Sequence, residues 1–177
     1  NARFHTPSGI TTDGTNLYVG NYWASRQIVI STGVVTTLAG KLGDDGRVDG
    51  TGTDAQFYVT RYLTTDGTNI FVVDEGSIRK VVISTGVVTT LAGSLSYAEG
   101  TTDGTGTSAR FKGPKGIATD GNYLYVADDK VIRKVVILTG VVTTIAGSVN
   151  SSGSTDATGS SARFSGLDGI TLDGTNL

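Results

Sequence analysis

The sequence predicts an all-β fold built from repeated four-stranded antiparallel units. Three observations predict it. Long strings of residues recur at a fixed spacing, short apolar stretches alternate with tight-turn dipeptides, and no segment sustains the 3.6-residue period of a helix. The 26 glycines and only two prolines suit a chain that turns often between strands.

Two markers define the repeat. The string Val-Val-Thr-Thr-Leu-Ala-Gly at 34–40 returns at 87–93 and, with Ile for Leu, at 141–147. The string Ala-Arg-Phe at 2–4 returns, once with Gln for Arg, at 55–57, 109–111 and 162–164, with spacings of 53, 54 and 53 residues. We therefore expect one domain over residues 1–177, with units at about 2–54, 55–108 and 109–161 and the start of a fourth at 162–177.

Each unit divides into four expected strands. The first, at 9–13 or 116–120, ends at an Asp-Gly turn, and Gly there accepts the positive φ of a tight hairpin. The other expected strands are at 16–20, 69–73 and 122–127, then at 78–83 and 132–137, and finally at 87–92.

Composition narrows the classes of function. The net charge is −2 and no Lys/Arg block occurs, which disfavours nucleic-acid binding, and no apolar run is long enough for membrane insertion. With no Cys and a single His, His5, the sequence predicts no disulfide, no metal site and no cofactor. Met is absent even at position 1, so we expect a processed chain or part of a longer one, and the lack of a signal peptide says nothing about compartment.

A unit of about 53 residues cannot cover both faces of its own sheet. Stacking units around an axis solves this, which predicts a β-propeller, a fold with 4 to 8 blades. The alternative, a linear β-solenoid, has shorter coils. Three blades and a third do not close a ring, so we expect either further blades in a longer chain, or a homo-oligomer in which two chains form one ring, or an end-to-end polymer. The duplicated first strand in 162–177 favours the longer chain.

One segment carries a family resemblance. Residues 116–128 (Gly-Ile-Ala-Thr-Asp-Gly-Asn-Tyr-Leu-Tyr-Val-Ala-Asp) followed by Ile132-Arg133-Lys134 resemble the NHL repeat, a β-propeller family. The first unit departs from the pattern, since Asn21 replaces the Asp, and the second has Tyr62-Leu63 in place of Gly-Ile. The resemblance implies four-stranded blades in a propeller that is usually six-bladed. It also implies a binding scaffold more often than an enzyme. NHL-like lyases hold a metal with several His, whereas this chain has only His5.

The hairpin loops of a meander alternate between two rims of the propeller. The Asp-Gly and Thr-Gly turns fall on one rim and are nearly identical between units. The other rim carries the loops between second and third strands and the long connections 41–54, 94–108 and 148–161, which differ between units. We predict a partner surface there, formed by Asn21, Tyr22, Trp23, Asp74, Glu75, Asp128 and Asp129. Drift in unconstrained loops would produce the same variation.

Several of these residues also have a structural interpretation. Asn21, Asp74 and Asp128 are expected to cap loop N–H groups, or else to point into the central funnel toward a ligand. Arg26, Arg79 and Arg133 are expected to pair with a carboxylate or a loop carbonyl. The acidic, Gly-rich stretches 44–54 and 102–107 suggest calcium binding, but they lack the residue spacing of an EF-hand. We instead interpret these stretches as tight Gly/Thr turns that place the Phe of the following Ala-Arg-Phe string between two blades.

The sequence thus predicts a non-enzymatic module that binds a protein or glycan, and its composition suggests an extracellular or cell-surface protein of bacteria. Two alternatives remain open. The blades are building blocks of a larger assembly or filament, or they belong to a hydrolase or lyase completed by blades outside this chain.

Overall fold

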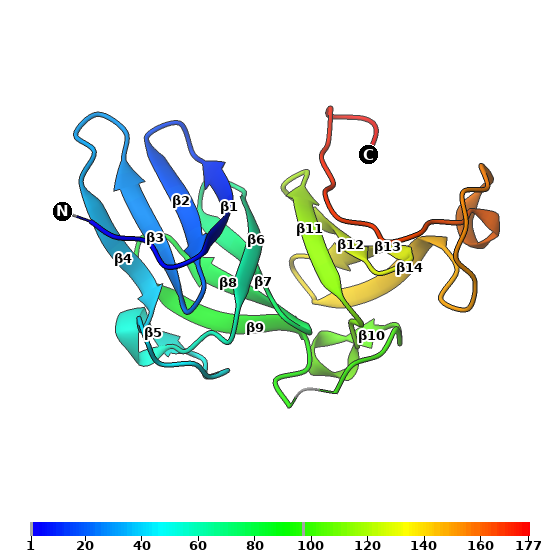
Figure 1. Ribbon diagram of the computed structural model, residues 1–177, viewed down its shortest axis with the longest axis horizontal. Helices are drawn as coiled ribbons and strands as arrows, with labels where there is room; N and C mark the ends of the chain where they lie inside the picture. Colours follow the sequence, from blue (N-terminus) through cyan, green and yellow to red (C-terminus); the bar gives the residue numbers. More distant parts are fainter. Residues whose placement is uncertain (1, 97) are drawn as a thin grey trace.

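The computed structural model describes residues 2–96 and 98–177, and it is all-β. Three antiparallel sheets follow one another along the chain, with strand orders β1-β2-β3-β4, β5-β9-β8-β7-β6 and β10-β14-β13-β12-β11. We call them blades 1, 2 and 3 (Figure 1). Blade 1 consists of β1 (Pro7–Thr12), β2 (Asn16–Asn21), β3 (Ala24–Val29) and β4 (Val35–Gly40). Blade 2 consists of β5 (Gly50–Thr51), β6 (Thr60–Thr65), β7 (Asn69–Asp74), β8 (Ser77–Val82) and β9 (Val87–Gly93). Blade 3 consists of β10 (Gly104–Thr105), β11 (Pro114–Thr119), β12 (Tyr123–Asp128), β13 (Val131–Val136) and β14 (Val141–Gly147).

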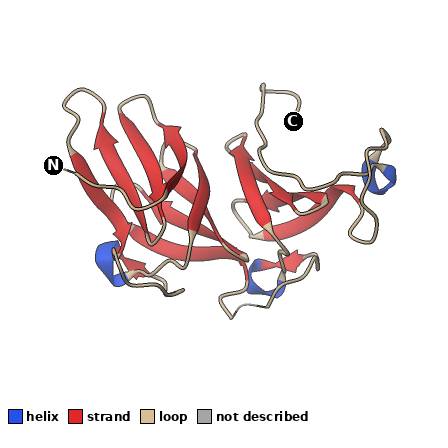
Figure 2. Ribbon diagram, viewed as in Figure 1, coloured by secondary structure: helices blue, strands red, loops and turns tan. Residues whose placement is uncertain are grey.

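Each strand whose bounds were predicted from the sequence is present, to within two residues at either end. Alternation sets the faces: in β12, Leu124 and Val126 are fully buried while Tyr123 and Tyr125 are only partly covered. Within residues 2–96 and 98–177, helix is confined to three single 3-10 turns, η1 (Gly52–Asp54), η2 (Gly106–Ser108) and η3 (Gly159–Ser161), as Figure 2 shows. No helix in the described part of the chain is long and apolar enough to cross a membrane.

The long connections do more than the sequence indicated. We expected them to be loops on one rim, but Gly50–Thr51 and Gly104–Thr105 form a fifth, outermost strand on the blade that follows. The amide of Gly52 then donates to the carbonyl of Gly86 at 2.9 Å, in a hairpin of the opposite rim. The ends of the connections 41–54 and 94–108 therefore run along the outer edge of the next blade, where their backbone groups find partners that a rim loop would lack.

The hydrophobic core lies between blades. Phe57 is fully buried among Tyr18 and Ala39 of blade 1 and Ile70 and Val72 of blade 2. Phe111 takes the same place between blades 2 and 3, so the expected position of this Phe is confirmed. Burying one such ring stabilises the fold by about 1.5–3 kcal/mol. Because β1 packs on β6 and β6 on β11, the blades share an inner edge, and the arrangement is β-propeller-like (Figure 1).

The start of the fourth unit lies against blade 3 but is not a strand. The amide of Gly116 donates to the carbonyl of Asp168 at 2.7 Å, yet residues 162–177 contain no strand, contrary to the expected second copy of the first strand. A hollow of about 460 Å³ over blade 3 is lined largely by apolar side chains, among them Ile132, Ile145, Phe164 and Ile170.

Candidate functional site

Three equivalent two-residue turns carry most of the predicted site residues. They join β2 to β3, β7 to β8 and β12 to β13, between the paired residues Asn21 and Ala24, Asp74 and Ser77, and Asp128 and Val131. We call them the tips, and the rim that they occupy the tip rim. In blade 1 of Figure 1 the tip lies at the end of the sheet opposite the β1–β2 and β3–β4 hairpins.

The first residue of every tip has a left-handed backbone. The φ angles are 56° at Tyr22, 51° at Glu75 and 56° at Asp129, whereas the second tip residue has no positive φ. This is the φ pattern of a type II′ turn, in which Gly is the usual first residue. Non-Gly residues at such φ values are uncommon and strained, and strain of this kind often accompanies function.

Contacts with the next blade hold two of these tips in place. The carbonyl of Tyr22 accepts a hydrogen bond from the amide of Thr60 at 2.6 Å, and that of Asp129 accepts one from Leu167 at 3.0 Å. For the tip of blade 2, the residue equivalent to Thr60 and Leu167 is Pro114, and a proline has no N–H to donate to the carbonyl of Glu75. The left-handed turn thus aims a backbone carbonyl at the neighbouring blade and leaves the two tip side chains to vary.

The tip of blade 1 is aromatic. Trp23 stacks on His5 with ring centroids 4.8 Å apart, and the edge of Tyr22 meets Trp23 at the same centroid distance. His5 also meets Tyr22 edge-on at 5.7 Å. Trp23 and Tyr22 are partly exposed, and His5 is exposed. Rigid aromatic side chains that keep one face or edge in water are typical anchors for a partner.

The other two tips are charged. Glu75 pairs with Arg61 at 3.2 Å, and Asp129 pairs with Lys112 at 3.1 Å. Because these pairs are largely exposed, each contributes at most about 1 kcal/mol to stability. Their effect is to place cationic donors and carboxylate acceptors side by side along the tip rim.

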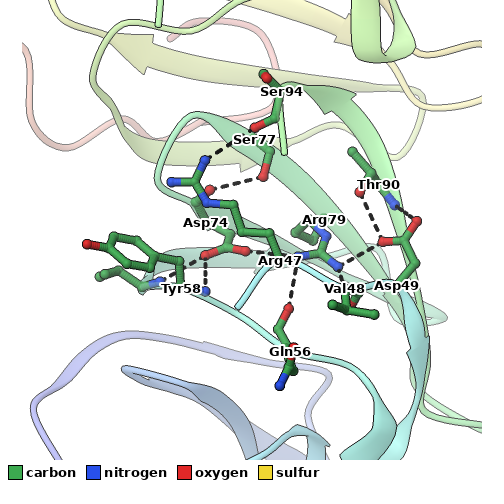
Figure 3. A network of polar contacts seen from close by, with 11 residues as sticks. Arg47, Val48, Asp49, Gln56, Tyr58, Asp74, Ser77, Arg79, Thr90 and Ser94 are labelled. Carbon is green, nitrogen blue, oxygen red and sulfur yellow. Dashed lines mark hydrogen bonds and ion pairs between the residues drawn. The ribbon is translucent and has the colours of Figure 1, made fainter. Parts of the chain in front are cut away.

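Beneath each tip, a buried Asp or Asn and a buried Arg bond to each other or to nearby backbone groups; we call this arrangement the buried frame. The Oδ1 atom of Asp74 accepts hydrogen bonds from the amides of Tyr58 and Val59 at 2.9 Å, and its Oδ2 atom pairs with Nη1 of Arg79 at 2.9 Å (Figure 3). Both side chains are fully buried. The guanidinium of Arg79 also pairs with Asp49 at 2.8 Å, bonds the carbonyls of Val48 and Gln56, and lies over the ring of Phe57.

Blade 3 repeats this frame with different residues. Asp128 caps the amides of Lys112 and Gly113, and Arg133 pairs with both Asp128 and Asp103. In blade 1, Oδ1 of Asn21 accepts from the amide of His5 at 2.6 Å, and Arg26 bonds the carbonyls of Arg3 and Thr36 instead of a carboxylate. The capping role expected for Asn21, Asp74 and Asp128, and the pairing expected for the three arginines, are confirmed.

Burial dominates the electrostatics of this frame. It raises the pKa of Asp74 above the ordinary value of an aspartate, against the opposing effects of Arg79 and the two amides. The pKa of Asp128 is raised for the same reason. These two carboxyls face the blade interior, whereas Tyr22, Trp23, Glu75 and Asp129 stand above them at the surface of the tip rim.

The structure adds positions that sequence reasoning missed. Two positions before the first residue of the inner strands β1, β6 and β11 stand His5, Tyr58 and Lys112, respectively. The second residues of these strands are Ser8, Arg61 and Lys115. These side chains border the tips: His5 contacts Trp23, Arg61 contacts Glu75 and Lys112 contacts Asp129. A position-by-position alignment of the repeats shows them varying inside otherwise similar segments, which is the signal that could have found them.

Among residues 2–96 and 98–177, no three His, Asp or Glu side chains are grouped closely enough to hold a metal ion. Asp49 and Asp103, from the stretches that raised the question of calcium, each bond a buried arginine and a threonine: Thr90 for Asp49 and Thr144 for Asp103.

Comparisons with known proteins identify the fold. No family model matches the chain, and no curated protein matches its sequence. Among solved structures, a Bacteroides thetaiotaomicron protein of unknown function is 24% identical, with a TM-score of 0.76 over 96% of this chain and 43% of that one. An auxiliary nutrient binding protein of Bacteroides ovatus is 18% identical, with a TM-score of 0.73 over 97% of this chain and 44% of that one. The extracellular domain of a two component system of Bacteroides thetaiotaomicron is 11% identical, with a TM-score of 0.55 over 81% and 17%.

At these identities the likeness shows the fold alone, and this chain spans less than half the length of each of the three. The resemblance to the NHL repeat stays a resemblance, since no family model supports it.

Proposed function

We propose that this chain is a non-enzymatic binding module that presents the tip rim to a protein or glycan partner. One observation carries the proposal. The backbone of the three tips and the buried frame beneath them are repeated, whereas the exposed side chains on the same positions change from aromatic in blade 1 to charged in blades 2 and 3. A surface that keeps its scaffold and varies its side chains is the design expected of recognition.

The structural neighbours support a binding role. One is described as a nutrient binding protein and another as an extracellular domain, which favours a module that meets its partner outside the cell. Tyr22 and Trp23 are the anchors that we assign to the partner, with Glu75 and Asp129 as polar contacts around them. Asn21, Asp74 and Asp128 act by holding these tips in position.

The ring that presents this rim is completed by further blades. The apolar hollow over blade 3 is where a following blade would pack, because Phe164 stands in the position of Phe57 and Phe111. Either the remaining blades of a longer chain or a second copy of this one would cover it, and six is the number of blades that we propose. Light scattering on the 177-residue chain distinguishes them: a dimer supports the second copy, and a monomer that binds added blades in trans supports the first.

The experiment that tests the function is a binding screen on a glycan array and on immobilised extracellular proteins. We expect Trp23→Ala to weaken binding of any hit by about 30-fold, since truncation of an aromatic anchor costs about 2 kcal/mol or more. Tyr123→Ala is the matched control, because Tyr123 is a partly exposed aromatic at the start of β12, on the opposite rim. Equal loss in both variants, or no loss in Trp23→Ala, would refute the assignment.

A further inference from the structure

The tip of blade 2 contains a glycine that neither the backbone nor the packing requires. Gly76 occupies the position of Trp23 in blade 1 and Lys130 in blade 3. Its φ is not positive, and an added Cβ would meet only the carbonyl oxygen of Phe111, at an ordinary 3.8 Å. An added Cβ would therefore fit, although Gly76 itself is buried.

Gly76 lines two of three adjoining hollows, which together form a groove. Hollows of about 110 and 140 Å³ share Glu75, Gly76 and Glu99 in their walls. The second of them shares Glu99, Lys112, Gly113 and Lys115 with a third hollow of about 210 Å³. We call this the rim groove; it runs from Tyr58 past Gly76 to Asp129. Each hollow is smaller than the roughly 300–1,000 Å³ of an enclosed small-molecule site. The shape therefore suits an extended chain that lays one unit in each hollow.

Charges of both signs alternate along the groove. Arg61 faces Glu75 at 3.2 Å and Lys112 faces Asp129 at 3.1 Å, while Lys115 pairs with Asp168 at 3.2 Å. An anionic or cationic ligand would compete with one member of each pair. A neutral polyhydroxyl ligand would not, because a hydroxyl both accepts from a cation and donates to a carboxylate.

The same lining disfavours a protein as the occupant. Interface cores between proteins are depleted in Lys, Glu and Asp, and these residues form much of the groove wall. The carbonyls of Tyr22 and Asp129, on the tips to either side, already accept hydrogen bonds from the next blade, so these tips are poor templates for an added peptide strand. Tyr58, with the guanidinium of Arg47 over its ring at 5.1 Å, lines one end of the groove, and the partly exposed Trp23 lies one blade away.

From the three adjoining hollows and the paired charges of both signs along them, we infer that the rim groove binds a neutral oligosaccharide, with one sugar unit in the hollow that Gly76 lines. This inference rests on the proposed function and narrows it to one class of partner.

The test is affinity gel electrophoresis of the 177-residue chain in gels that contain dextran, xyloglucan, galactomannan or inulin, with polygalacturonate as an anionic comparison. We expect retardation by at least one neutral polysaccharide. Gly76→Trp should weaken that binding by about tenfold or more, because the indole would occupy the hollow that Gly76 lines. Lys130→Trp is the matched control, since it places the same side chain at the equivalent tip position, which lines none of the three hollows, and it should bind as the wild type does.

A second filling variant guards against misfolding. Gly113→Trp enters the same groove from blade 3, where an added Cβ meets no atom within 4 Å, and it should also weaken binding. Circular dichroism and thermal unfolding confirm that each variant is folded. Raising NaCl from 50 to 500 mM should change the affinity by less than about twofold, because a neutral ligand gains little from screened charges.

Four results would overturn the inference. These are wild-type binding by both folded filling variants, a loss of binding in Lys130→Trp equal to that in Gly76→Trp, steeply salt-dependent binding to polygalacturonate alone, and no retardation by any neutral polysaccharide. The proposed function stands apart from these outcomes. If an immobilised protein binds the chain and Trp23→Ala abolishes that binding, the module has a partner on this rim and only its identity as a glycan is wrong.

Discussion

The two rims of the molecule are built by opposite rules. On the rim of the Asp-Gly hairpins, which we call the turn rim, the side chains themselves make the turn. Oδ1 of Asp66 accepts from the amides of Thr68 and Asn69 at 2.8 and 2.6 Å, and the same bonds recur at Asp13, Asp120 and Asp173. On the tip rim the turn is made by a left-handed backbone and a buried frame, and the exposed side chains take no part in it.

This difference shows why one rim is uniform and the other varied. A side chain that supplies the hydrogen bonds of its own turn cannot change without loss of the turn. A side chain that stands above a turn made by other groups is open to selection for a partner. Variation between repeats on the tip rim therefore identifies positions whose side chains are not needed to form the turn.

The largest effect expected from breaking this comparison is in the buried frame. Arg79→Met would leave the buried carboxylate of Asp74 without its cation, and such a loss costs about 3–5 kcal/mol. Arg26→Met is the matched change in blade 1, where Asn21 is neutral, and it should cost clearly less. Urea unfolding of both variants measures the difference. Equal costs would show that the carboxylate of Asp74 is not held as a charged partner.

A smaller effect is expected on the turn rim. Asp66→Ala removes the acceptor of two backbone amides and should lower the free energy of unfolding at pH 7 by about 1–2 kcal/mol. Asp45→Ala, at an exposed aspartate of the first long connection, is the control and should change it by less than about 0.5 kcal/mol.

The same variant tests the pH dependence. Although burial acts in the other direction, hydrogen bonds from Asn69 and Thr68 lower the pKa of Asp66. The unfolded chain therefore binds a proton more readily, and the contribution of Asp66 is complete above the unfolded pKa of about 3.9 and is lost as the pH falls through the folded pKa. The difference in unfolding free energy between wild type and Asp66→Ala should shrink on acidification below about pH 4. A difference that stays constant to pH 2 would contradict the assigned cause.

The smallest effect separates the backbones of the two rims. Gly67, in the turn rim, has a φ of +85° with open space around its Cα, so Gly67→Ala should destabilise the fold by about 1 kcal/mol through backbone strain alone. Glu75, in the tip rim, has a φ of 51°, so Glu75→Gly should leave stability unchanged or raise it by up to about 1 kcal/mol despite the lost exposed pair with Arg61. Thermal unfolding of the two variants checks the opposite signs. Destabilisation by Glu75→Gly would mean that its side chain helps to form the tip.

Much of the fold could be predicted, because its signals are local. The Asp-Gly turns and the alternation within β7 and β12 each depend on a few neighbouring residues, and the same signals occur in all three repeats. The outer strands β5 and β10 were missed, since a Gly-Thr pair has no strand signal until β9 or β14 lies beside it. The strand expected in the fourth unit is the opposite case, because its local signal is present but no strand among the described residues pairs with it.

The candidate site was predicted in part. Tyr22, Trp23, Glu75 and Asp129 stood out by their variation, but the contributions of His5, Arg61 and Lys112 depend on contacts between segments 14 to 18 residues apart. The groove at Gly76 depends on Glu99 and Lys115, which come from two further segments.

The amino-acid order alone determined the Asp-Gly turns, the main strands of the three blades and the number of repeats, since hydrogen bonds and side-chain alternation within about five residues settle them. Only the tertiary structure decided which rim side chains meet and where space remains between them. Those properties arise from segments far apart in the chain, and they exist only once the blades have packed on one another.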